Sequence, residues 1–194
     1  HDEVGSTLSS ISILSASALQ GVQKDLDAAR FGNIGDKARS ALDSISDIVW
    51  SVNPENDAMD KILARMSAYA SEILENVGTT LLMEVGEGVS CLHLPMEQRK
   101  DFYLIFKEAV NNCAKYAQAQ QVVVSLNIEG NTLLLRIQDD GIGFEIMHTT
   151  PEGRHFGGNG LRNMHSRAIA LGGQLTVVSQ PGAGTEVRVT VKVF

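Results

Sequence analysis

Asp139-Asp140-Gly141-Ile142-Gly143-Phe144 is the stretch that decides the fold, and it directly follows a predicted strand, Thr132–Gln138. Glycine permits positive φ and lets the backbone approach a ligand closely. A carboxylate at a strand end can accept a hydrogen bond from a ring that carries an amino group, such as adenine. The same residues also fit a glycine-rich hairpin turn with solvated acids, so the interpretation depends on the rest of the chain.

The composition limits the class of protein. The 194 residues are 43% apolar and 5% aromatic, which allows a mostly aliphatic core in one large domain or two small ones. The net charge of -7 argues against a nucleic-acid surface. Cys91 and Cys113 lack metal-ligand spacing, which fits a reducing compartment. Without a membrane-spanning run or signal peptide, we expect a cytoplasmic segment that makes no membrane contact.

Residues 1–53 are predicted to form a helical hairpin. Apolar residues recur at spacings of three and four from Val4 to Leu26 and from Ala38 to Val52, with a glycine-containing break at residues 31–35. A lone hairpin cannot bury both apolar stripes, so we expect a homodimer that completes a four-helix bundle. Pro54 ends the second helix and separates domain 1–53 from domain 54–194.

Residues 54–194 are predicted to form an α/β sandwich, which makes the fold class of the chain α+β. Periodicity predicts one mixed sheet layered with helices. The helices are expected at residues 58–76, 95–117 and 157–171, and the strands at 79–85, 121–128, 132–138, 174–179 and 185–194. Residues 145–159 are polar, glycine-rich and without periodicity, and they are interpreted as a mobile loop.

Two further stretches suggest chemistry. Glu108, Asn111, Asn112 and Lys115 fall three and four apart, so a helix places them on one stripe that could hold a hard cation and neutralise phosphate, or that is simply a solvated face. Gly157–Leu161 opens a helix and could cradle phosphate or merely cap that helix. One magnesium nucleotide could use both stretches and the acid-glycine turn. The motifs of P-loop and Rossmann proteins are absent.

With these residues in view, the chain resembles, over essentially its whole length, the catalytic core of a two-component sensor histidine kinase. The subfamily is the one whose dimerisation helix starts with His-Asp. Residues 108–116 resemble its N box, 139–144 its G1 box and 158–161 its G2 box, with Gly184-Thr185 before the last strand. The resemblance implies the GHKL (Bergerat) ATP-binding fold, shared with gyrase and mismatch-repair ATPases, beside a dimerisation and histidine phosphotransfer domain.

The resemblance also implies roles for individual residues. Asp139 would receive the adenine amino group, Glu108 and Asn112 would hold Mg²⁺, and Lys115 would touch the phosphates of ATP. The residues implied in nucleotide binding are Asn111, Asn112, Lys115, Tyr116, Asp139, Gly141, Gly143, Gly158, Gly160, Leu161 and Thr185. Tyr116 stands where the N box often has His.

By the same resemblance His1 is the phosphoacceptor, which passes its phosphoryl group to an aspartate of a response regulator. Neutral imidazole is a good nucleophile, and the adjacent Asp2 is the expected general base. A first-residue His can also be the remnant of an affinity tag. Ser6 replaces the Gln that orients water for dephosphorylation in this subfamily, so phosphatase activity is not implied.

Two other functions remain open at this stage. An ATPase of the same fold would use Glu108 to activate water and would not phosphorylate His1. A dimeric scaffold would bind nucleotide at most. The His-Asp helix favours the kinase over the ATPase, and intact Asn112, Asp139 and Gly160 favour an active site over a scaffold.

Overall fold

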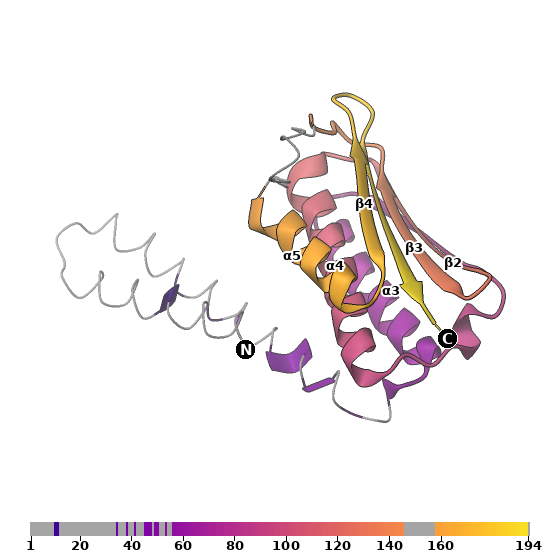
Figure 1. Ribbon diagram of the computed structural model, residues 1–194. Helices are drawn as coiled ribbons and strands as arrows, with labels where there is room; N and C mark the ends of the chain where they lie inside the picture. The colour runs from indigo at the N-terminus through magenta and orange to yellow at the C-terminus, as the bar shows by residue number, and fades with distance from the viewer. Residues whose placement is uncertain are drawn as a thin grey trace, which may run out of the picture. The chain divides into compact units, whose positions relative to one another are not determined.

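The computed structural model describes residues 56–145 and 158–193 continuously (Figure 1). Before them it describes only Asn53 and scattered helical residues, which are Ser10, Ile11, Ile34, Ala38, Ala41, Ile45, Ser46, Asp47, Val49 and Trp50. The chain divides into two compact units, His1–Asn53 and Pro54–Phe194. Most of the predicted hairpin and most of the loop at 145–159 lie outside the described residues. Ile34, placed by the sequence in a break, is helical.

One five-stranded sheet, with strand order β1-β2-β3-β5-β4, forms a layer of the second unit. The strands are β1 (Thr80–Val85), β2 (Gln121–Glu129), β3 (Thr132–Asp139), β4 (Gln174–Ser179) and β5 (Thr185–Lys192). β1 runs parallel to β2, and the remaining neighbours are antiparallel. The predicted α+β fold with a mixed sheet is therefore confirmed.

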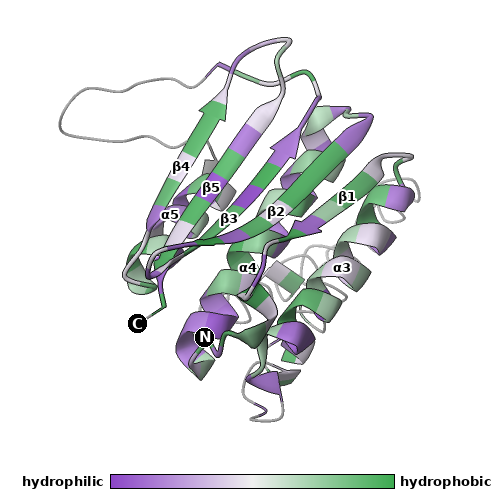
Figure 2. Cartoon of the chain, turned by 90° about the vertical axis from the view of Figure 1, so that its right-hand side faces the viewer, coloured by the Kyte–Doolittle hydropathy of each residue, from purple (hydrophilic) through white to green (hydrophobic). Residues whose placement is uncertain are grey.

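Three helices cover one face of this sheet (Figure 2). They are α3 (Met59–Glu75), α4 (Met96–Asn112) and α5 (Gly158–Ala170), all at positions that the periodicity predicted. A 3₁₀-helix, η2 (Val89–Cys91), was not predicted. A π-helical turn, η3 (Cys113–Ala117), continues α4, so the predicted helix at 95–117 changes its hydrogen-bond pattern over its last turn. No helix among the described residues is both long and apolar enough to span a bilayer.

The core lies between the helices and the sheet. Along β3, buried residues alternate with half-buried ones, because successive side chains of a strand point to opposite faces. Fully buried side chains of α4, including Phe102 and Phe106, belong to the same core. The aliphatic strand residues of this core include Val122, Val124, Leu126, Leu133, Leu135, Ile137, Val189 and Val191.

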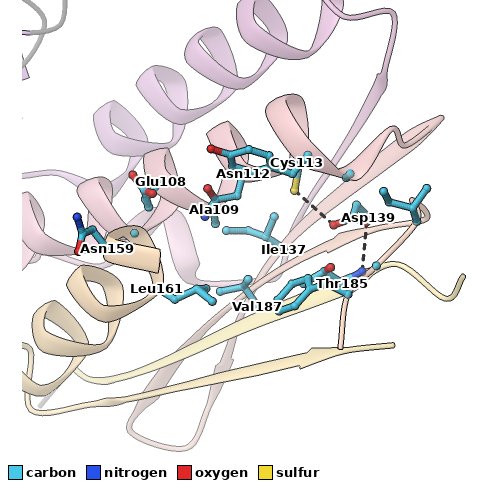
Figure 3. Close-up of a pocket in the computed structure, with 16 residues that line it drawn as sticks. Glu108, Ala109, Asn112, Cys113, Ile137, Asp139, Asn159, Leu161, Thr185 and Val187 are labelled. Atoms are coloured by element: carbon cyan, nitrogen blue, oxygen red, sulfur yellow. Dashed lines mark hydrogen bonds between the residues drawn. The ribbon is translucent and has the colours of Figure 1, made fainter. Parts of the chain in front are cut away.

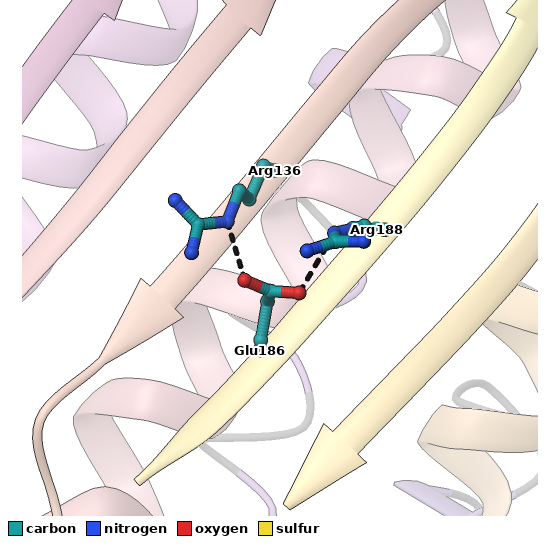
Figure 4. Close-up of polar contacts among 3 residues, drawn as sticks. All are labelled: Arg136, Glu186 and Arg188. Carbon is teal, nitrogen blue, oxygen red and sulfur yellow. Dashed lines mark hydrogen bonds and ion pairs between the residues drawn. The ribbon is translucent and has the colours of Figure 1, made fainter.

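The opposite face of the sheet carries a charged cluster (Figure 4). Arg136 of β3 is the register partner of Arg188 of β5, and like charges in that position repel. Glu186 of β5 forms ion pairs with both, to Arg136 Nε and, at 2.7 Å, to Arg188 Nε. The carboxylate thus offsets the repulsion between the two arginines, on a face that none of the described helices α3, α4 and α5 covers (the uncovered face).

Phe106→Ala is expected to lower the free energy of unfolding by about 3–5 kcal/mol, because it removes a fully buried aromatic side chain. Urea unfolding followed by far-UV circular dichroism measures the loss. Ile169→Ala is the control, since Ile169 is 62% exposed on α5; its effect should stay within about 0.5 kcal/mol. Equal effects of the two substitutions would contradict this account of the core.

Candidate functional site

A cavity of about 670 Å³ opens between α4, η3, the ends of β3 and β5 and the first turn of α5 (Figure 3). This size suits a small organic ligand. Its lining combines apolar side chains with polar groups at both ends. The lining residues are Glu108, Ala109, Asn112, Cys113, Tyr116, Ala117, Ile137, Asp139, Ile142, Gly143, Phe144, Asn159, Gly160, Leu161, Thr185 and Val187.

The face of α4 and η3 that borders the cavity differs from the predicted stripe. Glu108 and Asn112 line the cavity, as the sequence indicated, but Asn111 and Lys115 are not among the lining residues. Asn111 Oδ1 instead accepts a hydrogen bond from the Tyr69 hydroxyl of α3, at 2.9 Å. Residues 111 and 115 lie about 100° around the helix from their neighbours 112 and 116. The cavity lies on the side of the helix that carries residues 112 and 116.

The Asp139 carboxylate lies at one end of the cavity and is 4% exposed. Its Oδ1 atom accepts hydrogen bonds from the backbone N–H groups of Gly141, at 3.0 Å, and Thr185, at 3.2 Å. Its Oδ2 atom lies 3.7 Å from the Sγ atom of Cys113. The carboxylate therefore connects the end of β3 with the start of β5 and with the helix opposite.

The neighbouring Asp140 has a different role. It is exposed, and its Oδ1 atom accepts hydrogen bonds from the backbone N–H groups of Gln120 and Gln121, at 2.8 and 2.9 Å. These bonds hold the turn after β3 against the start of β2. Of the two adjacent carboxylates, only Asp139 lines the cavity.

The two glycines of the turn allow close contacts within the protein. A Cβ atom on Gly141 would lie 2.1 Å from the carbonyl oxygen of Ala117, and the Ile142 N–H donates to that same oxygen at 2.8 Å. Gly143 has φ +59°, and a Cβ there would lie 2.0 Å from the carbonyl oxygen of Gln180. The sequence suggested that both backbones approach a ligand, but Gly141 is not among the lining residues and its close neighbour is Ala117.

Ser179, at the end of β4, organises the same turn and was not singled out from the sequence. Its buried Oγ atom accepts a hydrogen bond from the Phe144 N–H at 2.9 Å and donates to the Gly184 carbonyl at 3.0 Å. It also lies 2.9 Å from Thr185 Oγ1. A serine at a strand end carries no local signal of this role, because Phe144 comes from a distant segment and the other two partners lie across the β4–β5 turn.

Glu108 lies near the other end of the cavity, beside α5, and Asn112 lies between Glu108 and Cys113 (Figure 3). A Cβ on Gly160 would lie 2.0 Å from Glu108 Oε1, so this carboxylate rests against the first turn of α5. The partial positive charge of a helix N-terminus favours an anion there. Carboxylate and carboxamide oxygens are also ligands for Mg²⁺, which usually takes further oxygens from phosphates and water. The described residues contain no group of three or more His, Cys, Asp or Glu arranged for a metal.

The Cys113 thiol is held in its protonated form. Burial raises its pKa, and the negative charge of Asp139 and the hydrogen bond to it raise that pKa further. A raised pKa means that less thiolate exists at any given pH, so at neutral pH the thiol keeps its proton and can donate it.

The remaining predicted site residues divide into three groups. Tyr116, Leu161 and Thr185 line the cavity, with Tyr116 68% exposed. Gly158 is the first residue of α5 but is not in the lining. His1 and Asp2 lie outside the described residues. Sequence reasoning missed the apolar lining, because strand residues such as Ile137 and Val187 are indistinguishable by pattern from ordinary core residues.

Gly141→Ala is expected to lower the free energy of unfolding by about 1–3 kcal/mol, because its Cβ would overlap a backbone carbonyl of another segment. Gly160→Ala is the matched control, since the atoms nearest to its Cβ would be those of the Glu108 side chain, which can rotate, and not a backbone carbonyl. Urea unfolding compares the two variants. A loss for Gly141→Ala no larger than that for Gly160→Ala would show that the approach to Ala117 is not a constraint.

In the folded protein at pH 8, a thiol reagent is expected to label Cys91 at least about tenfold faster than Cys113. Cys91 is exposed, whereas Cys113 is buried and its raised pKa leaves little thiolate. Mass spectrometry of the labelled peptides reports both rates in one sample, and unfolding in urea should make them similar. Fast labelling of Cys113 in the folded state would be inconsistent with its burial.

Comparison with known proteins relates this cavity to a family. Residues 97–193 match the family described as "Histidine kinase-, DNA gyrase B-, and HSP90-like ATPase". An uncharacterized sensor-like histidine kinase of Chloroflexus aurantiacus is 25% identical over 169 residues, 81% of this chain and 28% of that protein. Sensor protein VraS of Staphylococcus saprophyticus is 31% identical over 107 residues, 55% of this chain and 29% of that protein. The chain thus spans less than a third of these relatives.

Solved structures share the fold. The Acinetobacter baumannii histidine kinase AdeS superposes with a TM-score of 0.65 at 15% identity, over 98% of this chain and 97% of that one. The histidine kinase domain of the Erythrobacter litoralis EL346 blue-light activated histidine kinase superposes with a TM-score of 0.58 at 18% identity, over 100% of this chain and 95% of that one. At these identities the likeness is one of fold.

Proposed function

Because this chain belongs to the histidine kinase-, DNA gyrase B- and HSP90-like ATPase family, we propose that it is the catalytic core of a two-component sensor histidine kinase. It would transfer the γ-phosphoryl group of ATP to His1 and then to an aspartate of a response regulator. The observation that carries this proposal is the cavity, whose two polar ends suit the base and the phosphates of one nucleotide. The sensor kinases among the similar proteins support it.

The Asp139 end of the cavity suits a nucleobase. The Oδ2 atom of Asp139 can accept a hydrogen bond from an exocyclic amino group, since a carboxylate oxygen accepts more than one donor. Ile137 and Val187, which border the middle of the cavity, supply apolar surface for a flat ring. Thr185 lines the wall at the start of β5. These residues fit adenine.

The opposite end suits the phosphates. Glu108 and Asn112 offer the oxygens that would hold Mg²⁺, and Mg²⁺ would supply neutralisation of the phosphate charge. The first turn of α5, with Gly158 and Gly160, would present backbone N–H groups to phosphate oxygens. Lys115 is exposed, and its contact with phosphate rests on the family resemblance alone.

The phosphoryl acceptor belongs to the first unit. One imidazole nitrogen of His1 would attack the γ-phosphorus while the bond to the leaving oxygen of ADP breaks. Asp2 would accept the proton from the other nitrogen. Residues 1–53 would pair with a second copy as a four-helix dimer, and the acceptor aspartate would come from the receiver domain of a response regulator. We place this activity in the cytoplasm, with no nucleic acid involved.

The proposal predicts an acid-labile, base-stable label after incubation with γ-labelled ATP and Mg²⁺. His1→Gln should abolish the label, because the nucleophile is lost. Asn112→Asp should lower it at least about tenfold, because the oxygen set for the cation changes. The assay uses the longest naturally occurring form of this protein as the sample. Thr176→Ala, on the uncovered face of the sheet, is the control and should label normally.

Three results would contradict the proposal. A label that survives His1→Gln would place the phosphoacceptor elsewhere. Release of phosphate without any protein label, abolished by Glu108→Gln, would instead establish an ATPase that activates water. Measured ATP binding without either reaction would mean that the protein is a nucleotide-binding scaffold.

A further inference from the structure

The Cys113 thiol is the group that η3 presents to the buried Asp139 carboxylate (Figure 3). The Sγ atom lies 3.7 Å from Asp139 Oδ2, within the distance at which a thiol donates a weak hydrogen bond. Cys113 is 8% exposed and Asp139 is 4% exposed, and both line the cavity. No motif of the sequence identified Cys113 as part of the site.

The contact adds a restraint to the orientation of the Asp139 carboxylate. Both backbone hydrogen bonds to Asp139, from Gly141 and Thr185, converge on the single atom Oδ1. Rotation about the Cβ–Cγ bond moves both oxygens, so these two bonds limit it, but the torsion has a broad energy minimum and small rotations remain available. The thiol is a donor to Oδ2 from a different element, and it narrows this remaining range.

A thiol suits this position because it is a weak donor. The thiol is the donor in this contact, because an ionised carboxylate can only accept hydrogen bonds. The Oδ2 atom has a second lone pair, so it can accept a ligand N–H while the thiol remains in place. A weak, long bond also leaves this oxygen a strong acceptor.

We propose that Cys113 is a positioning residue for base recognition. Its thiol keeps Asp139 Oδ2 directed into the cavity, so that the site favours a nucleobase with an exocyclic amino group over the same base without one. This inference rests on the proposed nucleotide-binding function. It assigns Cys113 a role distinct from filling space, which a small buried Cys can also do.

The two roles predict different responses to the ligand. If Cys113 only fills space, Cys113→Ala should weaken every nucleotide by the same factor. If it acts through Asp139, the loss should appear only for ligands whose amino group reaches Oδ2. A thermodynamic cycle that combines Cys113→Ala with removal of the ligand amino group isolates the coupling between the thiol and that amino group.

The experiment measures dissociation constants of ATP and of purine riboside triphosphate, which lacks the 6-amino group, by isothermal titration calorimetry. Cys113→Ala is expected to weaken ATP binding about threefold to tenfold, the usual value of one hydrogen bond, here the bond from the ligand amino group to Oδ2. The dissociation constant of purine riboside triphosphate should change by less than about twofold. Cys113→Ser retains a donor and should restore most of the preference for ATP. Cys91→Ala is the matched control at an exposed thiol.

Equal weakening of both nucleotides by Cys113→Ala, or the same loss of preference in Cys113→Ser, would overturn the inference and leave nucleotide binding intact. Failure of the native chain to bind either nucleotide would overturn the proposed function itself. Thermal unfolding of each variant identifies any that is not folded, and Cys113→Ser then decides the question if Cys113→Ala is lost.

Discussion

The hydrogen bonds of one buried carboxylate connect the parts of this structure that form the site. Asp139 ends β3, accepts N–H groups from the turn that follows and from the start of β5, and meets a thiol from the helical layer. A buried charge is costly unless its oxygens are hydrogen-bonded. The ends of two strands and of one helix must therefore converge on Asp139, and the cavity lies where they do.

Close backbone packing makes this convergence possible. The turn after β3 lies against the end of η3 because Gly141 has no side chain, and the turn before β5 lies against the same strand end. A Cβ on Gly184 would fall 2.1 Å from the Asp139 carbonyl oxygen. Ser179 joins the two turns through its hydroxyl. The glycines of the acid-glycine stretch are thus explained by contacts within the protein as much as by a ligand.

Charged groups are distributed differently over the two faces of the sheet. The uncovered face carries the cluster of Arg136, Glu186 and Arg188, whose partly exposed arginines are screened by water. In the cavity on the covered side, the carboxylates of Asp139 and Glu108 lie apart, with apolar residues between them. This separation of polar ends by an apolar middle matches a molecule with a flat ring and an anionic tail, as the family relationship indicates.

The similarity to histidine kinases concerns mainly the second unit of the chain. The described residues that line the cavity come from Pro54–Phe194, and the family match covers residues 97–193 of that unit. The proposed phosphoryl acceptor, in contrast, belongs to the helical unit, whose dimeric arrangement remains a prediction.

The sequence by itself determined the order of the elements, the mixed sheet, its buried face and the polar residues Glu108, Asn112 and Asp139. These follow from local signals, because apolar periodicity and glycine positions act over a few residues. Only the tertiary structure decided which side of α4 faces the cavity, so that Asn111 bonds Tyr69 instead. It alone placed Ala117 against Gly141 and Cys113 against Asp139. Those contacts join segments more than about 20 residues apart, and their geometry comes from packing, which no local pattern encodes.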